Sequence, residues 1–182
     1  MVAVTLRPFN MMTRFIRLPA AALAGAMCLL GAARMLAAVP DAPAPASGLL
    51  HWTNVFTSGR DGYHTYRIPS LLASARGALL AFAEGRKQDS SDTGEIDLLL
   101  KRSTDSGRSW SAQQMVWDDG ANTCGNPCPV VDRDTGTIWL LLTWNRGDDR
   151  EPQIIAQTSR DTRRVFVTSS TDDGLTWSPP RE

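Results

Sequence analysis

The sequence has little cysteine, tyrosine or histidine, and it has no net charge. Its 182 residues include three Cys, two Tyr and two His, and 19 basic residues balance 19 acidic ones. Three cysteines are too few for a disulfide-bonded scaffold. A nucleic-acid-binding protein needs an excess of Lys and Arg to displace counterions from phosphate, so the charge balance argues against that class. The apolar content of 42% with 21% charged residues is typical of a globular protein.

The first 46 residues differ in composition from the rest. Three arginines precede an uncharged apolar run, Leu18–Ala33, which is shorter than the ~20 residues that span a bilayer. The small residues Ala44-Pro45-Ala46 before Ser47 suit a cleavage site. We therefore expect residues 1–46 to be a signal peptide with a Pro/Ala-rich spacer; an uncleaved membrane anchor is the alternative. Export would place residues 47–182 in the periplasm, on the cell surface or in the medium.

The segment 47–182 retains 15 basic and 18 acidic residues. In an oxidising compartment Cys124 and Cys128 could pair, although a bridge across three residues must meet tight geometry, and the sequence leaves this open. Neither a His nor a further Cys lies near this pair, so we expect no zinc site there and no cofactor.

Short apolar runs bounded by Gly, Asp, Ser and Pro follow Ser47, and no apolar period of 3.6 residues lasts three turns. This pattern predicts an all-β fold. The expected strands are Ser70–Ala75, Ala78–Glu84, Asp97–Ser103, Gln113–Trp117, Pro129–Asp132, Thr137–Thr143 and Arg164–Ser170.

One motif occurs twice, 67 residues apart. Ser103–Trp110 and Ser170–Trp177 both read Ser-x-Asp-x-Gly-x-x-Trp, which is the Asp-box motif. The Asp carboxylate can accept backbone N–H groups in a tight turn, Gly supplies a positive φ, and Trp folds back as an apolar plug. We expect a structural role for the residues of both boxes: Asp105, Gly107, Trp110, Asp172, Gly174 and Trp177.

The two repeats align as strand, short turn, strand, long polar loop, strand, Asp box and strand. A repeated four-stranded antiparallel unit is a propeller blade, and the fourth strand of the second unit should begin near Pro180. Loops before the first strand and after the second should emerge together, opposite the Asp boxes. These loops are Thr57–Pro69, Gly85–Ile96, Asp119–Pro127 and Trp144–Arg163. Their many arginines suit a polar ligand that bears a carboxylate.

Three segments on that side give the sequence a resemblance to a known family. Tyr66-Arg67-Ile68-Pro69 resembles the arginine-containing motif of sialidases (neuraminidases) of the bacterial type. Ala81–Arg86 and Asn126–Pro129 resemble the next two segments of that family, and the Asp boxes are hallmarks of it. The resemblance implies a six-bladed β-propeller, of which this chain would contain about the first two blades.

The resemblance also implies an exo-α-sialidase that releases terminal sialic acid from glycoproteins, glycolipids or oligosaccharides. Arg67 matches the first member of an arginine triad that grips the sugar carboxylate, and Arg86 and Asn126 would also bind substrate. Asp92 is our choice for the general acid/base, with Asp89 as the second candidate. Sialidases use Tyr as the nucleophile.

The family pattern needs two further Arg, a Glu and the Tyr nucleophile from later blades. We therefore expect this chain alone to be inactive and to represent the front of an enzyme. Two alternatives stay open: a non-catalytic Asp-box propeller that binds glycan or protein, and a trans-sialidase.

Overall fold

The computed structural model describes residues 2–4 and 52–182, and nearly all of the regular secondary structure in them is β-strand. The elements in chain order are β1 (Val2–Val4), β2 (Thr53–Phe56), β3 (Thr65–Ala73), β4 (Leu79–Arg86), β5 (Ile96–Ser103), β6 (Gln114–Trp117), β7 (Thr123–Val131), β8 (Ile138–Asn145), α1 (Glu151–Ile155) and β9 (Arg164–Ser170). The predicted signal peptide and spacer lie almost wholly outside these residues. No helix in the described residues is long and apolar enough to cross a membrane.

The strands form two successive antiparallel units. Strands β3 to β6 pair in order in the first unit, and β7, β8 and β9 pair in order in the second. A single parallel pair, Ile96 with Thr123, joins the units, and the short strands β1 and β2 pair with each other. An isolated bridge between Val167 and Arg181 lies where the fourth strand of the second unit was expected. The all-β prediction is confirmed, and we call the two units blade 1 and blade 2.

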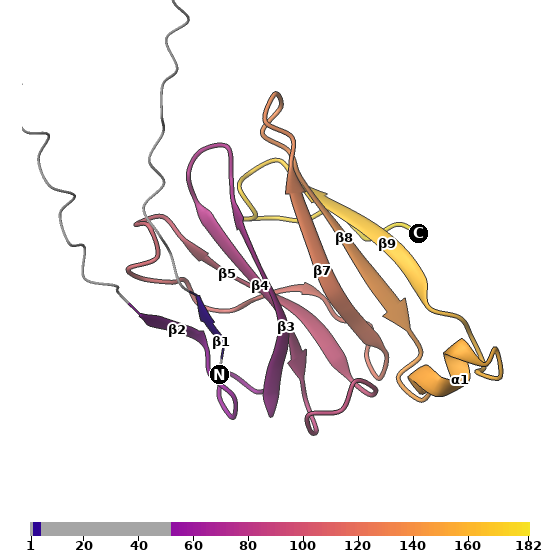
Figure 1. Cartoon of the computed structure of the whole chain (residues 1–182). Coiled ribbons are helices and arrows are strands. Elements are labelled where there is room, and N and C mark those ends of the chain that lie inside the picture. Colours follow the sequence, from indigo (N-terminus) through magenta and orange to yellow (C-terminus); the bar gives the residue numbers. More distant parts are fainter. Residues whose placement is uncertain (1, 5–51) are drawn as a thin grey trace, which may run out of the picture. The chain divides into compact units, whose positions relative to one another are not determined.

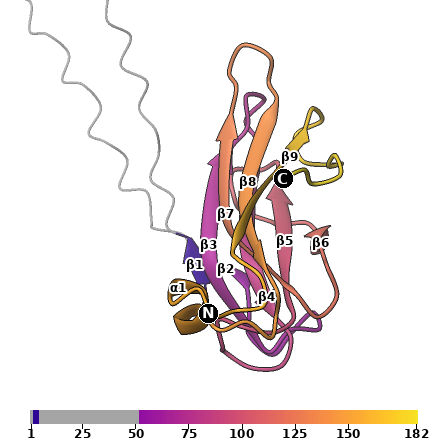
Figure 2. The ribbon, with the colours of Figure 1, turned by 90° about the vertical axis from the view of Figure 1, so that its right-hand side faces the viewer.

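The ends of the blades separate two kinds of connection (Figures 1 and 2). In both views α1, in the β8–β9 connection, lies at the lower end and the β7–β8 turn at the upper end. The second Asp box lies at the same end as the β3–β4 turn, since Arg76 Nη1 is 3.7 Å from Asp173 Oδ2. The polar β4–β5 and β8–β9 connections therefore share the end opposite the Asp boxes.

The predicted loop boundaries are wrong at three site residues. Strand β3 begins at Thr65, β4 ends at Arg86 and β7 begins at Thr123. Arg67, Arg86 and Asn126 therefore lie within strands and not in the loops Thr57–Pro69, Gly85–Ile96 and Asp119–Pro127. The sequence pattern marked only the apolar part of each strand. Backbone pairing continues beyond it, because a ladder needs hydrogen bonds and not apolar side chains.

The main core lies between the two blades. Because side chains alternate along a strand, one face of β4 and β5 meets one face of β8. The fully buried residues there are Leu80, Phe82, Leu98, Leu100, Cys124, Ile138, Leu140 and Leu142. A second cluster on the other face of blade 1 contains Val55, Phe56, Tyr63, Tyr66, Ala81, Ala83 and Leu99.

The two cysteines of the described part are unpaired. Cys124 is buried in the core between the blades and Cys128 is exposed, and both are free thiols. Burial raises the pKa of the Cys124 thiol, so it stays protonated as a small apolar side chain.

Both Asp boxes make the same turn contacts. Asp105 accepts hydrogen bonds from the backbone N–H (2.9 Å) and hydroxyl (2.6 Å) of Ser109, and Asp172 accepts the same pair from Thr176 at the same distances. The glycines have φ of 84° and 79°, which a residue with a side chain adopts only with strain. Each carboxylate is thus committed to its own turn.

The second Asp box docks blade 2 onto blade 1. Trp177 packs edge-on against Phe82 of β4, with ring centroids 5.8 Å apart, and the Arg102 Nε of β5 donates to the Asp173 carbonyl (2.7 Å). Trp110 of the first box packs in turn against the second cluster. The Asp box is therefore a local turn and also a contact between blades.

Candidate functional site

A bulge in each blade shapes the site. The register of β3 against β4 shifts between Arg67 and Ser70, and that of β7 against β8 shifts between Gly125 and Cys128. The residue before proline has positive φ in both bulges: 51° for Ile68 and 53° for Asn126. Positive φ is unfavourable for a β-branched residue such as Ile, and strain of this kind is concentrated at functional positions.

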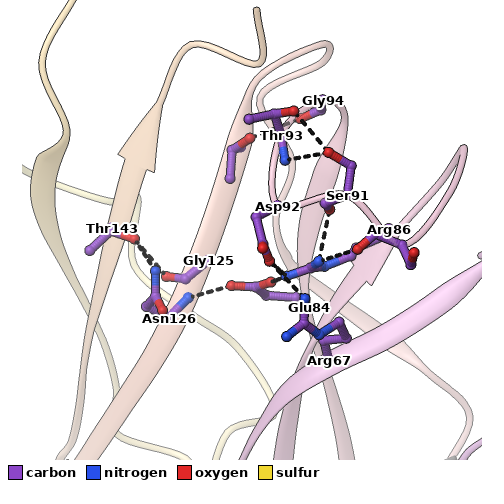
Figure 3. Close-up of polar contacts among 12 residues, drawn as sticks. Arg67, Glu84, Arg86, Ser91, Asp92, Thr93, Gly94, Gly125, Asn126 and Thr143 are labelled. Carbon is purple, nitrogen blue, oxygen red and sulfur yellow. Dashed lines mark hydrogen bonds and ion pairs between the residues drawn. The ribbon is translucent and has the colours of Figure 1, made fainter. Parts of the chain in front are cut away.

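Arg67 and Asp92 form an ion pair at the end of blade 1 that lies opposite the Asp boxes (Figure 3). The distance from Arg67 Nη1 to Asp92 Oδ1 is 2.9 Å, and the two side chains are 45% and 59% exposed. An arginine with one ion-pair partner and a half-exposed side chain can accept a second anion from solvent. The pair therefore joins two sequence candidates in a position open to a ligand.

Arg86 lies behind this pair and is buried. Its Nη2 is 2.7 Å from the same Asp92 Oδ1, and its Nη1 donates to the carbonyls of Ser90 (2.7 Å) and Ser91 (2.8 Å). Its Nε and Nη2 donate to Glu84 Oε2. With its side chain 3% exposed, Arg86 holds the loop that carries Asp92. A direct contact of Arg86 with substrate stays a prediction.

The positive surroundings of Asp92 lower the pKa of its carboxyl below the usual value. The hydrogen bond from Arg86 is the main cause, and the charges of Arg86, Arg67 and Arg163 act in the same direction, whereas burial opposes them. Asp92 is therefore ionised in the free protein. Asp89, the second candidate, accepts the backbone N–H of Ser91 (2.7 Å), which is a local turn contact.

Asn126 reaches the same cluster from blade 2. Its backbone N–H donates to Glu84 Oε1 (2.9 Å), and its side-chain Nδ2 donates to the Thr143 hydroxyl (2.8 Å). A Cβ at Gly125 would lie 2.3 Å from Glu84 Oε1, so glycine is needed there for close approach. Glu84 therefore contacts both blades with one carboxylate (Figure 3).

The base of the Asp92 loop is held by a second buried group. Lys87 pairs with Glu95 across the loop, and its Nζ is 3.3 Å from Asp97 Oδ2, which also accepts a hydrogen bond from the Tyr63 hydroxyl (2.6 Å). Desolvation raises the pKa of Asp97, although the hydrogen bonds from Tyr63 and Lys87 oppose this shift. The loop is thus fixed at its base as well as at Asp92.

Both tyrosines of the sequence are engaged away from the ion pair. Tyr63 donates to Asp97, and the Tyr66 hydroxyl donates to the Arg60 carbonyl (2.9 Å). Desolvation raises the pKa of both, to about 12 for Tyr66. Neither phenol is placed to act as an accessible nucleophile.

The sequence predicted that one end of the blades holds Arg67, Arg86, Asp92 and Asn126. It gave no functional role to Glu84. An available signal was its position two residues before Arg86 in one strand, since such residues share a face. In the sequence, Glu84 stands out only as the last residue of the expected strand Ala78–Glu84. The Lys87–Asp97 contact was also missed, because it joins the two ends of a loop.

Comparison with known proteins assigns the chain to a family. Residues 77–182 match the family described as BNR repeat-like domain. The chain is 40% identical over 136 residues to an exo-alpha-sialidase of Aspergillus fumigatus, covering 65% of this chain and 33% of that protein. It is 34% identical over 158 residues to a sialidase of Micromonospora viridifaciens, covering 78% of this chain and 23% of that protein.

A solved structure is similar in fold as well as in sequence. The Hadza microbial sialidase Hz136 aligns with a TM-score of 0.61 and 32% identity, covering 68% of this chain and 27% of that one. The chain thus spans a third or less of the length of these three proteins. The described blades are part of a β-propeller of the sialidase type, and the chain belongs to the family of BNR repeat-like domains and is homologous to sialidases.

Proposed function

We propose that the protein is an exo-α-sialidase, which hydrolyses terminal sialic acid from glycoconjugates, and that this chain supplies the first part of its active site. The observation that carries the proposal is the half-exposed Arg67 side chain beside the ionised Asp92, at the end of the blades that Asn126 also reaches. The sialidase relatives support the same activity.

Arg67 binds the carboxylate of the sugar. A guanidinium can form two parallel hydrogen bonds to a carboxylate, which gives both affinity and orientation. Asn126 lies on the neighbouring blade, where its backbone is fixed by Glu84 and its side chain by Thr143. This placement suits a contact with an uncharged polar group of the same sugar, such as its acetamido group.

Asp92 transfers the proton. As the bond between the anomeric carbon and the glycosidic oxygen breaks, protonated Asp92 donates its proton to that oxygen, and a tyrosine oxygen bonds to the anomeric carbon while its own proton passes to the Glu of the family pattern. Water then attacks the same carbon and gives a proton to Asp92, and the tyrosine leaves as it regains its proton from that Glu. Tyr63 and Tyr66 are engaged elsewhere, so this tyrosine belongs to a part of the protein outside the present chain.

Substrate binding at Arg67 favours the protonated form of Asp92. In the described residues Asp92 is the ion-pair partner of Arg67. The positive charge of Arg67, together with the hydrogen bond from Arg86, favours the carboxylate form of Asp92. A substrate carboxylate on Arg67 neutralises that charge and adds a negative charge nearby. Both changes raise the pKa of Asp92 above that in the free protein and so favour the protonated form that donates the proton, while the hydrogen bond from Arg86 remains in place.

The proposal also includes export of the protein from the cytoplasm. The basic, apolar and small-residue pattern of residues 1–46 supports a signal peptide, and a sialidase outside the cytoplasm would meet sialylated glycoproteins and glycolipids directly. Mass spectrometry of the N-terminus of the mature protein tests this part. A mature protein that still begins at Met1 would contradict it.

The activity is tested with the complete protein and sialyllactose. We expect release of free sialic acid, detected by chromatography, and a loss of roughly a hundredfold or more in kcat for Asp92→Asn. A complete protein that binds sialyllactose without cleaving it would instead be a non-catalytic propeller. Transfer of sialic acid to added lactose, labelled to distinguish it from the substrate, would identify a trans-sialidase.

A further inference from the structure

We propose that Glu84 is a positioning residue that fixes the Asp92 loop of blade 1 relative to the Asn126 bulge of blade 2. The inference rests on the proposed function for its catalytic consequence. Its structural part, a single buried carboxylate that joins two blades beneath the site, stands on the contacts alone.

The carboxylate of Glu84 is divided between the two blades. Its Oε2 accepts from Arg86 Nη2 (2.7 Å) and Nε (3.3 Å), and its Oε1 accepts the backbone N–H of Asn126 (2.9 Å). The side chain is 4% exposed. A buried carboxylate with both oxygens engaged in this way has little freedom to move, because breaking either contact leaves one oxygen of a buried charge without its partner.

Through Arg86 the carboxylate acts on Asp92. Arg86 joins Glu84 to the carbonyls of Ser90 and Ser91 and to Asp92 Oδ1, so the acid/base group and its loop are anchored to a side chain that is itself anchored by Glu84. Arg67, in contrast, has Asp92 as its ion-pair partner and is half exposed. Arg67 thus faces the ligand, whereas Glu84 lies one layer deeper.

Across the blade interface the carboxylate acts on Asn126. The bulge at this residue has positive φ, and the Glu84 contact holds the N–H group that the bulge withdraws from the regular β7–β8 ladder. Gly125 leaves the space that the carboxylate fills. Asp92 and Asn126, 34 residues apart in the sequence, therefore keep one relative position.

The kinetic test compares two leaving groups in the complete protein. Sialyllactose has a sugar leaving group that needs the proton of Asp92, whereas 4-nitrophenyl sialoside has an activated leaving group that needs it much less. We expect Glu84→Gln to lower kcat/KM for sialyllactose roughly tenfold or more beyond its effect on the 4-nitrophenyl substrate. Misfolding of part of the sample would lower both values equally, so equal losses would overturn the proposal.

The matched control is Glu95→Gln, which makes the same chemical change in a carboxylate paired with Lys87 in the same loop. Glu95 contacts neither Arg86 nor Asn126 in the described residues, so we expect a smaller change in the ratio of the two substrates. An equal or larger change for this variant would show that any loosening of the loop suffices, and it would overturn a specific role for Glu84.

A second readout does not depend on activity. We expect Glu84→Gln to accelerate hydrogen exchange at the Asn126 amide roughly threefold or more, because a neutral acceptor forms a weaker hydrogen bond than a carboxylate. Glu95→Gln should leave that amide unchanged. An unchanged Asn126 amide in Glu84→Gln overturns the structural part. Absence of any sialidase activity in the wild type would refute only the proposed function.

Discussion

At the scale of single residues, Arg67 links the binding of a ligand to the ionisation of Asp92. It lies in a strand next to a bulge, it is half exposed, and its ion-pair partner is the proposed acid/base Asp92. A ligand carboxylate and Asp92 therefore compete for one guanidinium. Substrate binding and proton transfer are coupled through this competition. The first can be tested by substituting Arg67, and the second by varying the pH.

Arg67→Lys should weaken substrate binding. A lysine keeps the charge but loses the two-pronged contact with a carboxylate, and a charge-assisted hydrogen bond contributes about 1.5–3 kcal/mol. We expect KM for sialyllactose to rise about tenfold to a hundredfold, measured in the complete protein. The control is Arg133→Lys in the β7–β8 turn at the opposite end, which should leave KM unchanged. A similar KM in both variants would contradict the role of Arg67.

The pH dependence should differ between free and substrate-bound protein. Arg86, Arg67 and Arg163 lower the pKa of Asp92 in the free protein, and the buried Glu84 pairs with Arg86. Since the proton donor must be protonated, the rate falls as pH rises through this pKa. We expect the high-pH limb of the kcat profile to lie at higher pH than that of kcat/KM, because bound substrate occupies Arg67. Limbs that coincide would contradict this coupling.

At the scale of strands, turns and bulges, the sequence predicted some boundaries correctly and others wrongly. The short apolar runs bounded by turn residues predicted the strands, and β9 begins and ends at the predicted residues. This pattern failed where polar residues continue a strand, as at Arg67 and Asn126. Each of these positions lies at a bulge that also contains a proline, Pro69 or Pro127. Backbone pairing and the proline set the conformation there, so the apolar pattern does not indicate where the strand begins.

The site shows the same division between local and long-range information. Arg67, Arg86 and Asp92 are encoded in short segments whose resemblance to sialidases could be seen in the sequence. The bridge from Glu84 to Asn126 spans 42 residues and two blades, and it uses a backbone N–H group that no side-chain pattern reveals.

The Asp boxes should make stability sensitive to acid. Hydrogen bonds from Thr176 lower the pKa of Asp172 from 3.8 to about 2. A carboxyl with a lowered pKa in the folded state stabilises the fold above its unfolded pKa, and this contribution is lost as pH falls from about 4 to about 2. We expect Asp172→Ala to cost about 1 kcal/mol at neutral pH and to flatten the decline over that interval.

Urea unfolding of the complete protein at several pH values measures this effect. Asp134→Ala is the control, since the Asp134 side chain makes no hydrogen bond within residues 52–182 and lies in an exposed turn. Equal pH dependence in both variants would show that the Asp box is not a source of acid sensitivity.

At the scale of the whole molecule, stability depends on how one blade docks on the next. The core between the blades is apolar, and the second Asp box inserts Trp177 against Phe82. On the face of blade 2 that points away from blade 1, Val130, Trp139 and Leu141 are exposed. This apolar face suits the docking of a further β-sheet in the complete protein.

Gly174→Ala should disturb the contact between the blades. A Cβ there would lie 2.5 Å from Leu80 Cδ2, and φ is +79°. Gly136→Ala is the matched control, because it has φ of +75° but its nearest neighbour would be 3.9 Å away. We expect the control to cost about 1–2 kcal/mol from backbone strain, and Gly174→Ala to cost about 1–3 kcal/mol more from overpacking, measured by urea unfolding. Equal losses would contradict tight docking of the box.

In the proposed function, this end of the two blades binds the carboxylate of a sialic acid through Arg67 and presents Asp92 to its glycosidic bond. A crystal structure of the complete protein with 2-deoxy-2,3-didehydro-N-acetylneuraminic acid tests this binding mode. We expect the ligand carboxylate to lie on the Arg67 guanidinium, Asp92 to be released from Arg67, and Glu84 still to join Arg86 to Asn126. A ligand bound elsewhere, or an Arg67–Asp92 pair left intact beside the bound ligand, would contradict this binding mode.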